Sequence, residues 1–340
     1  MYKIAVLPGD GIGPEVTEAA VKVLHAVQEA VEGLELVLIY GDAGYYCIDK
    51  YGTNLPTETI SLLKETAACL KGPMTTPEDP GAPPSVAVTI RKKFDLYANL
   101  RPCRALPGVP AANPKIDMLI VRENTEGLYS GIEFEVSKGR GIAIRVITQE
   151  ASEKIARIAF NYASKRKKHL TCVHKRNILR ITDGIFREAV FRIANEYPEV
   201  LVDEEHVDAM AMRLIKEPEK FDVIVTTNLF GDILSDEAAQ LAGGIGLMPG
   251  ANIGDSYGMF EPVHGSAPKH AGKNRANPIA MILASKMMME YLNEKEAANR
   301  IENAVISVLR EGRVRTYDLG GNSTTTEVGE AIAKKVLEHS

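Results

Sequence analysis

The first forty residues limit the fold more than any other segment does. Residues 3–7 form a short apolar run that stops at Pro8-Gly9, which is typical of a buried strand followed by a turn. Residues 14–31 carry apolar side chains at helical spacing, and Pro14 suits the first turn of a helix. Residues 34–40 predict a second strand. A strand, a helix and a strand within ~40 residues predict a layered α/β fold.

The same alternation continues along the chain. Further strands are expected at 68–71, 116–121, 141–148, 170–174 and 221–226. Further helices are expected at 57–68, 151–163, 183–197, 233–242, 278–291 and 295–310. Residues 72–84 are rich in proline and glycine and predict a loop. The length predicts about two domains, and no internal repeat interrupts the pattern.

The composition excludes several classes of protein. Hydrophobic residues make up 45% and charged residues 25%, which excludes a disordered chain, and the net charge of -5 argues against a partner that is nucleic acid. No apolar run approaches ~18 residues, so no membrane-spanning helix and no membrane partner are expected. The start lacks the features of a signal peptide. Without metal-site spacing, the cysteines predict reduced, mostly buried thiols in a cytoplasmic enzyme: Cys47, Cys69, Cys103 and Cys172.

A glycine-rich turn, residues 9–13, lies between the first strand and the first helix. A phosphate loop belongs at such a place, because the start of a helix offers free amides. The turn lacks the GxGxxG and GxxxxGK[ST] patterns, which argues against a kinase, and Asp10 would repel a phosphate. A structural tight turn is the alternative.

Three acids stand out. Asp232 and Asp236 are four residues apart, so on a helix they share one face, where a Mg²⁺ or Mn²⁺ ion would compensate their repulsion. A solvated helix face is the alternative. Asp208 lies alone in an apolar stretch, which indicates a buried, metal-bound carboxylate or an acid at a helix edge.

Several basic residues stand at expected strand ends or loop edges. Arginines that converge on one cleft would bind a polycarboxylate, although each could equally be a surface charge: Arg91, Arg101 and Arg122. Lys175 ends an expected strand, where a buried lysine could serve as a base. His264 lies in a polar turn and could be structural or catalytic.

Several segments together resemble one family, the β-decarboxylating dehydrogenases that act on isocitrate, homoisocitrate and 3-isopropylmalate. The resemblance rests on GDGIGPEV (9–16), IRKKFDLYANLRP (90–102), VRENTEGLYSG (121–131), VHKRNI (173–178), FGDILSDEAA (230–239), ANIGD (251–255), EPVHGSAP (261–268), ANP (276–278) and DLGGN (318–322). It implies an isopropylmalate-dehydrogenase-like two-domain α/β fold, in which helices flank a central mixed sheet, and not a Rossmann fold.

The resemblance also implies how the chain is divided. Residues 1–100 and 250–340 would form a large domain on the coenzyme side, and residues 101–249 a small domain. An arm near residues 130–147 would interlock two copies in a homodimer or a higher homo-oligomer.

The resemblance assigns roles residue by residue. Arg91, Arg101 and Arg122 would hold the malate-like carboxylates of a small 2-hydroxy tricarboxylate, with Ser85 and Asn177 also contacting it. Tyr129 would protonate the enol after decarboxylation, and Lys175 of a second copy would help to deprotonate the hydroxyl. Asp232 and Asp236, with Asp208 of the second copy, would bind Mg²⁺ or Mn²⁺. These are the residue types that oxidation followed by decarboxylation requires.

The residues after the HGSAP turn indicate the coenzyme. Lys269, His270 and Tyr317 resemble the NADP-using members, since a 2′-phosphate needs positive charge, whereas NAD-using members place an acid there. Gly321 departs from this pattern, because an arginine is expected at its position, and Arg275 is a candidate substitute. NAD is the alternative. The implied coenzyme contacts are Thr75, Thr76, Glu261, His264, Gly265, Ser266, Ala267, Lys269, His270, Asn277 and Tyr317.

The substrate is less constrained. Ser85 stands six residues before Arg91, as in isocitrate enzymes, but Ala87 replaces their asparagine. We rank isocitrate first, with conversion to 2-oxoglutarate, then homoisocitrate and 3-isopropylmalate, with tartrate and malate as further alternatives. A non-catalytic subunit of a hetero-oligomeric dehydrogenase is the alternative of another class.

Overall fold

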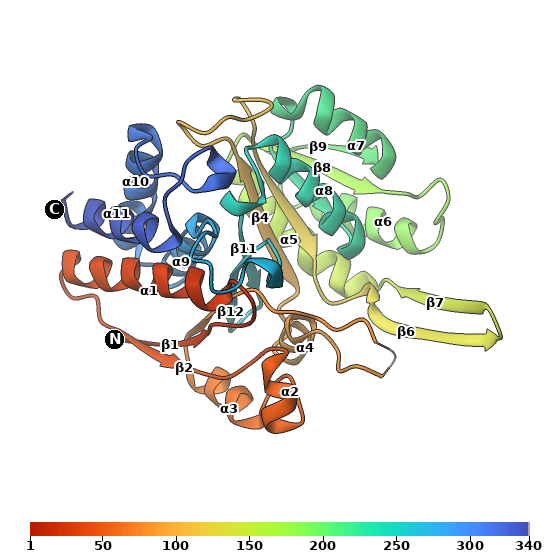
Figure 1. Ribbon diagram of the computed structural model, residues 1–340. Coiled ribbons are helices and arrows are strands. Elements are labelled where there is room, and N and C mark those ends of the chain that lie inside the picture. The colour runs from red at the N-terminus through yellow and green to blue at the C-terminus, as the bar shows by residue number, and fades with distance from the viewer. Residues whose placement is uncertain (80, 339–340) are drawn as a thin grey trace.

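A computed structural model describes residues 1–79 and 81–338, and a sheet of ten strands organises it (Figure 1). In spatial order the strands are β2 (Leu36–Tyr40), β1 (Tyr2–Leu7), β3 (Ala68–Lys71), β12 (Gly258–Pro262), β11 (Pro249–Ile253), β4 (Ala98–Arg104), β5 (Asp117–Glu123), β10 (Val223–Thr226), β8 (His169–His174) and β9 (Leu201–His206). The central pairs β12–β11, β11–β4 and β4–β5 are antiparallel, and the outer pairs are parallel. The expected mixed sheet flanked by helices is confirmed.

Eleven α-helices surround the sheet in the described part of the chain. They are α1 (Gly13–Ala30), α2 (Tyr46–Tyr51), α3 (Thr57–Glu65), α4 (Val86–Lys93), α5 (Gln149–Ser164), α6 (Thr182–Ala194), α7 (Val207–Lys216), α8 (Asn228–Leu241), α9 (Ile279–Tyr291), α10 (Lys295–Glu311) and α11 (Thr325–Glu338). Helix α1 is amphipathic, and its apolar face from Val16 to Val27 is buried.

The two ends of the chain pack together. Helix α1 lies against α11, and β12 inserts between β3 and β11, so that the red N-terminal and blue C-terminal elements share one side of Figure 1. The other side is formed by β5, β10, β8 and β9 with α5 to α8. A division into domains at residues 100 and 250 stays a prediction, because the sheet runs through both sides without interruption.

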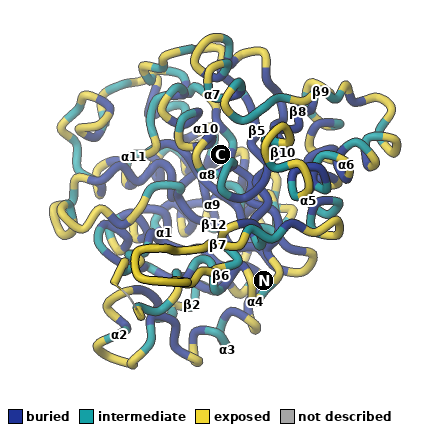
Figure 2. The backbone as a smooth tube through the Cα atoms, turned by 90° about the vertical axis from the view of Figure 1, so that its right-hand side faces the viewer, coloured by how far each residue is buried: buried dark blue, intermediate teal, exposed yellow. Residues whose placement is uncertain are grey.

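Strands β6 (Gly127–Ser137) and β7 (Arg140–Val146) form a separate two-stranded ribbon that projects from the body (Figure 1). The ribbon is almost entirely exposed (Figure 2), and it nevertheless carries large apolar side chains: Leu128, Ile132, Phe134, Val136, Ile142 and Ile144. Exposed apolar side chains in such number are typical of a surface that meets another chain. This ribbon coincides with the arm expected near residues 130–147.

The sequence patterns missed several elements, both short and long. They did not predict helices α2, α4, α7 and α11 or strands β4, β6, β9, β11 and β12, although β6 falls in the arm that the resemblance implies. Proline and glycine lie within or beside β4, β11 and β12, and pairing across the sheet overrides their poor strand propensity. Helix α8 begins at Asn228, five residues before the expected start at 233, so Asp232 is internal to it.

The described residues bear on two expectations drawn from the composition, one about the cysteines and one about membrane-spanning helices. All four cysteines are free and buried, which confirms the prediction of reduced thiols. Among residues 1–79 and 81–338, no helix has the length and apolar character needed to cross a bilayer.

Candidate functional site

The glycine turn at residues 9–13 is a tightly packed structural element. Gly9 and Gly11 have positive φ angles, and a Cβ on Gly11 would lie 2.0 Å from the carbonyl oxygen of Ser266. The Asp10 carboxylate accepts hydrogen bonds from the backbone amides of Tyr45 at 2.8 Å and Thr75 at 2.9 Å. The carboxylate therefore ties three loops together, and the structure supports the tight-turn interpretation over a phosphate loop.

Helix α8 places Asp232 and Asp236 beside two arginines from the adjacent strands. Arg122 on β5 forms an ion pair with Asp232, and Arg101 on β4 lies 3.1 Å from Asp232 and 3.4 Å from Asp236. Gly231 permits this packing, since a Cβ there would lie 2.7 Å from the Arg122 side chain. The carboxylates thus share one helix face, as the i, i+4 spacing predicts, and that face meets the sheet rather than bulk solvent alone.

Tyr129, on the ribbon strand β6, completes this group. Its hydroxyl donates a hydrogen bond to Asp232, and the Arg122 guanidinium lies 5.1 Å from the centre of its ring. Burial and the bond to Asp232 raise the pKa of Tyr129, with Arg122 opposing. The hydroxyl is therefore protonated at neutral pH and available as a proton donor.

The two aspartates differ in their titration. Burial alone would raise the pKa of Asp232, but Arg122 and Arg101 outweigh it and the pKa is lowered. Burial raises the pKa of Asp236, and the opposing attraction of Arg101 does not overcome it. Asp232 is therefore the firmly ionised member of the pair.

A second group of charges is formed by Arg91, in the last turn of α4, with residues of β12 and β3. Arg91 is buried, and its guanidinium lies 3.0 Å from Glu261 on β12, whose other oxygen lies 2.7 Å from Lys71 on β3. Burial alone would raise the pKa of Glu261, but the two cations outweigh it and the pKa is lowered. The Nε atom of Arg91 is buried without a hydrogen-bond partner, so this donor is left for a ligand.

One cavity holds the second group and reaches the first through Arg101 alone. This pocket of about 160 Å³ is lined by Lys71, Arg91 and Glu261, by Arg101, and by Ser85 and Ala87. Ser85 directly precedes α4, and Ala87 is in its first turn. The structure thus brings together Ser85, Arg91 and Arg101, as expected for a site that binds carboxylates, and Arg101 links this cavity to Asp232.

The remaining expected residues, Lys175, Asn177 and Asp208, lie apart from that cavity. Lys175 follows β8 and forms an ion pair with Asp208 in the first turn of α7. The side chain of Asp208 is 68% exposed, and Lys175 lowers its pKa. Of the two interpretations left open for Asp208, a single chain shows the acid at a helix edge and not the buried carboxylate: the apolar residues around it define the opposite face of α7, which buries Met210 and Leu214. Asn177 is exposed in the same region.

No trio of acidic, histidine or cysteine side chains able to hold a metal is present within the described residues of one chain. Asp232 and Asp236 form one pair of hard oxygen donors, and Asp208 is a third donor elsewhere on the surface. Carboxylate oxygens are the donors that Mg²⁺ and Mn²⁺ prefer, so the donor chemistry fits these ions. A single chain supplies two of the three expected ligands in one place.

A larger cavity of about 440 Å³ adjoins the glycine turn. It is lined by Ile12, Ile245, Gly246, His264, Gly265, Ala267, His270, Ala276, Asn277, Tyr317 and Asp318. The His270 and Tyr317 rings stack at 6.0 Å between centroids, and the Arg275 guanidinium lies 5.0 Å from the Tyr317 ring. This cavity therefore gathers six of the residues expected to contact a coenzyme: His264, Gly265, Ala267, His270, Asn277 and Tyr317.

Other expected coenzyme contacts lie at its margin or elsewhere. Thr75 and Ser266 share a hydrogen bond of 2.7 Å between their hydroxyls, while Thr76 and Lys269 are exposed and do not line the cavity. Glu261 belongs to the cavity with Arg91, where it holds two cations, and so does not face His270 and Tyr317.

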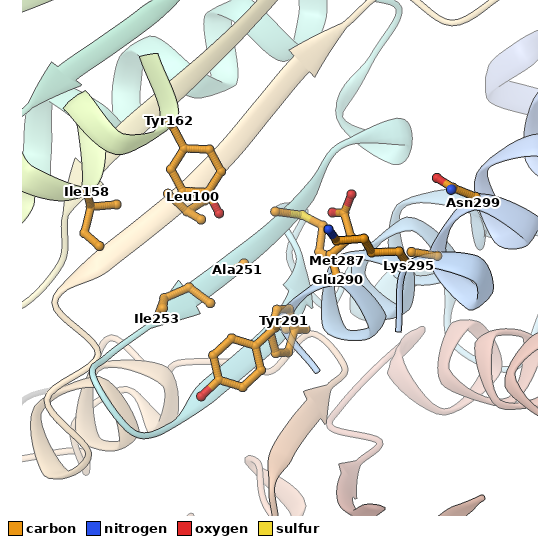
Figure 3. Close-up of a pocket in the computed structure, with 12 residues that line it drawn as sticks. Leu100, Ile158, Tyr162, Ala251, Ile253, Met287, Glu290, Tyr291, Lys295 and Asn299 are labelled. Atoms are coloured by element: carbon orange, nitrogen blue, oxygen red, sulfur yellow. The ribbon is translucent and has the colours of Figure 1, made fainter. Parts of the chain in front are cut away.

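A further cavity of about 450 Å³ contains none of the expected site residues (Figure 3). Ile158 and Tyr162 enter it from α5, and Met287, Glu290 and Tyr291 from α9. Its walls are mainly apolar, and it lacks the paired charges seen around Asp232. We therefore place the candidate active site at the other two cavities.

Sequence reasoning missed the polar residues that hold the arginines. Asn228 accepts hydrogen bonds from both Nε and a terminal nitrogen of Arg122, at 3.0 and 2.7 Å. Ser235 accepts one from Arg101, and Lys71 shares Glu261 with Arg91. Asn228 and Ser235 lie within or next to the FGDILSDEAA motif, which is the signal that could have found them.

Comparisons with known proteins agree with this geometry. The family described as isocitrate/isopropylmalate dehydrogenase matches residues 3–332. The 3-isopropylmalate dehydrogenase of Methanothermobacter thermautotrophicus is 50% identical over 333 residues, which cover 98% of each chain. The isocitrate/homoisocitrate dehydrogenase of Thermus thermophilus is 47% identical over 339 residues, again 98% of each chain.

A solved structure is equally similar. The crystal structure of isocitrate dehydrogenase from Methylococcus capsulatus superposes with a TM-score of 0.94 at 46% identity, covering 99% of this chain and 100% of that one. With the paired aspartates, the converging arginines and the tyrosine in place, the chain belongs to the isocitrate/isopropylmalate dehydrogenase family, the dehydrogenases of the β-decarboxylating type.

Proposed function

We propose that the chain oxidatively decarboxylates a malate with a substituent at carbon 3, with 3-isopropylmalate as the first candidate. The observation that carries this choice is the lining of the cavity at the start of α4. Met74, Ala87 and Val263 present apolar groups there, while Lys71 and Arg91 are already paired with Glu261. An apolar substituent fits these three side chains, and the polar part of the same lining is left for the carboxylates of the malate core.

Isocitrate and homoisocitrate form the second candidate. Ser85 lines the same cavity and offers one hydroxyl to a third carboxylate, and the relative from Thermus thermophilus is named for both substrates. The sequence alone ranked isocitrate first. The 50% identity to a 3-isopropylmalate dehydrogenase favours the reverse order, and the three apolar side chains in a cavity that is otherwise largely polar support it.

In this proposal the arginines hold the malate core. Arg91 offers its unpartnered Nε atom, Arg101 lines the same cavity, and Arg122 meets Asp232 from the adjacent strand. Each guanidinium is held in place by a fixed acceptor, so little side-chain entropy is lost when a carboxylate binds. The result is a preorganised grip on two carboxylates.

Proton transfer is assigned to Tyr129 and Lys175. Tyr129 is protonated at neutral pH and lies beside Asp232, so it can deliver a proton to the enol left after loss of carbon dioxide. Lys175, from a second copy of the chain, would accept the hydroxyl proton of the substrate. Exposed Met212 and Ile215 on α7 and exposed Ile233 on α8 support such a homodimer, because they are apolar surface residues on the same helices as Asp208 and as the pair Asp232 and Asp236.

Asp232 and Asp236, with Asp208 of the second copy, would hold Mg²⁺ or Mn²⁺. When bound, the ion and the nicotinamide supply a Lewis acid and a hydride acceptor, respectively. The residues of the chain orient the substrate between them and keep Asp232 ionised through Arg122 and Arg101.

NADP is the proposed coenzyme, with NAD as the alternative. The cavity of about 440 Å³ is lined by His270 and Tyr317, and Arg275 stacks on Tyr317 at 5.0 Å. Asp318, the acid in that cavity, already accepts hydrogen bonds from Asn277 and Thr316. The cations of this region suit a 2′-phosphate.

The coenzyme assignment is tested by Arg275→Asp and Lys269→Asp. Each should raise KM for NADP by roughly tenfold or more and change KM for NAD far less, because only the 2′-phosphate is repelled. Equal effects on both coenzymes would overturn the choice of NADP. Lys273→Asp, in the same loop, is a control for a general change of charge.

The substrate assignment is tested by initial rates with 3-isopropylmalate, homoisocitrate, isocitrate and tartrate, each with Mg²⁺ and both coenzymes. The highest kcat/KM is expected with 3-isopropylmalate, and Ala87→Asn should shift preference toward isocitrate. No turnover of any of them would instead support a non-catalytic subunit. A cytoplasmic location remains a prediction of the sequence.

A further inference from the structure

Two buried side-chain amides lie at the cavity beside the start of α4: Asn99 is part of its lining, and Asn252 stands behind Asn99. Asn252 on β11 and Asn99 on β4 are at most 1% exposed, and neither position was singled out from the sequence. The Asn252 side chain donates to Glu261 at 2.8 Å and accepts from Asn99 at 2.7 Å. Asn99 in turn accepts from the Nε atom of Arg101 at 2.7 Å.

These hydrogen bonds therefore join the two arginines. Glu261 holds Arg91 at one end, and Asn99 holds Arg101 at the other. Asn252 stands between them and makes further bonds to Asn124, at 3.0 Å, and to the carbonyl oxygen of Met259, at 3.1 Å. Every polar atom of its amide is used, which is how a fully satisfied buried network becomes rigid.

The direction of every bond is fixed by charge at the two ends. The ionised Glu261 only accepts hydrogen bonds, so the Asn252 nitrogen must face it and the Asn252 oxygen must face Asn99. The guanidinium of Arg101 only donates, so the Asn99 oxygen must face it. The orientation that Glu261 requires of Asn252 and the one that Arg101 requires of Asn99 are compatible, because the Asn99 nitrogen then donates to the Asn252 oxygen. An aspartate at position 252 would lose the donor that faces Glu261.

We propose that Asn252 is a positioning residue, which sets the spacing of Arg91 and Arg101 by linking Glu261 to Asn99. Asn252 does not line the cavity itself, so it acts through these two arginines and not by touching substrate. The inference rests on the proposed function, in which Arg91 and Arg101 hold the two carboxylates of the malate core.

The first test is Asn252→Asp in the full-length enzyme. A carboxylate oxygen would then face Glu261 at about the distance of a hydrogen bond, and two carboxylates so close cannot both be ionised without repulsion. The KM for the diacid that the wild type uses best should rise by roughly tenfold or more. The coenzyme KM should change by less than about twofold, because His270 and Tyr317 lie in the other cavity.

A double variant provides the rescue. When Asn252→Asp is combined with Glu261→Gln, the new amide at position 261 can donate to the new carboxylate at position 252, and the count of negative charges is that of the wild type. We expect the double variant to bind the diacid more tightly than Asn252→Asp does alone. Binding of the diacid with Mg²⁺ and without coenzyme, measured by calorimetry, gives the same comparison without turnover.

Two further variants separate positioning from folding. Asn99→Asp keeps the acceptor for Arg101 and loses the donor to Asn252, so it should weaken diacid binding in the same direction. Asn161→Asp makes the same chemical change at an exposed residue of α5 and should leave KM at the wild-type value. Thermal denaturation identifies any variant that is not folded.

The outcomes are distinct. A folded Asn252→Asp enzyme with an unchanged diacid KM, or a double variant no better than the single one, would overturn the positioning role. A wild type that turns over none of the diacids would instead overturn the proposed function. Equal rises in the KM values for diacid and coenzyme would show a general structural role and would also contradict the proposal.

Discussion

Two carboxylates in this chain, Asp232 and Asp208, both meet basic side chains, but their surroundings differ. Asp232 meets two arginines and Tyr129, and its side chain is 34% exposed, whereas Asp208 meets Lys175 and is 68% exposed. Asp232 is held between helix α8 and the strands β4 and β5, which carry its two arginines. Asp208 lies on a surface helix, α7, next to apolar side chains that face solvent.

The difference indicates how the site is divided. Exposed ion pairs contribute little to stability, so a contribution to folding does not explain why Lys175 and Asp208 are paired at this position. A group held ready at an apolar surface is explained if a second copy of the chain covers it. One chain would then contain a finished half of the site, at Asp232, and donate the other half, at Lys175, to its neighbour.

The largest effect is expected when the half of the site around Asp232 is disrupted. Asp232→Asn removes the charge that Arg122, Arg101 and Tyr129 converge on, and kcat/KM should fall by about a thousandfold or more. Assays with saturating Mg²⁺ measure this loss. Asp49→Asn, at an exposed position of α2, is the matched control, and wild-type rates for Asp232→Asn would disprove the metal assignment.

The next largest effect is expected when the contact between two copies of the chain is disrupted while Asp232 and Lys175 are left unchanged. Met212→Glu with Ile215→Glu puts two charges on the exposed face of α7, which should yield monomers and lower the rate by about a hundredfold. Light scattering gives the mass and enzyme assays give the rate. Tyr40→Glu is the control at an exposed apolar residue of the edge strand β2. A fully active monomer would show that one chain suffices.

A smaller effect sharpens the role of the finished half. Tyr129→Phe removes the proton donor and keeps the ring packed near Arg122, so overall turnover should fall by about tenfold to a hundredfold. Reduction of the corresponding 2-oxo acid, a step that needs no enol protonation, should be much less affected. If overall turnover were unchanged, another group would have to be the acid.

The sequence predicted the parts of the site that depend on local spacing. The shared helix face of Asp232 and Asp236 follows from a separation of four residues, and it was found. Whether Arg91, Arg101 and Arg122 converge could not be read locally, because they belong to three elements that only the mixed sheet brings together. Their convergence was first implied by the resemblance.

Two limits of the sequence reasoning have a common physical cause. The apolar neighbours of Asp208 suggested burial as one of two interpretations, but those neighbours divide between a buried face and an exposed face of α7. Asn252 was not predicted because an amide in a strand has no recognisable sequence pattern. Its proposed positioning role depends on hydrogen bonds to Glu261 and Asn99 in other strands. Contacts across a sheet are set by register, which the sequence does not display.

The central claim, a site shared between two copies, is tested most directly by mixing two inactive variants. Asp232→Asn and Lys175→Met are co-expressed with different tags, and the mixed dimers are purified and assayed. In a shared arrangement one of the two sites in each mixed dimer contains both native groups, so the mixed dimers should recover about half of the wild-type activity. Mixed dimers as inactive as their parents would show that both residues serve the same chain.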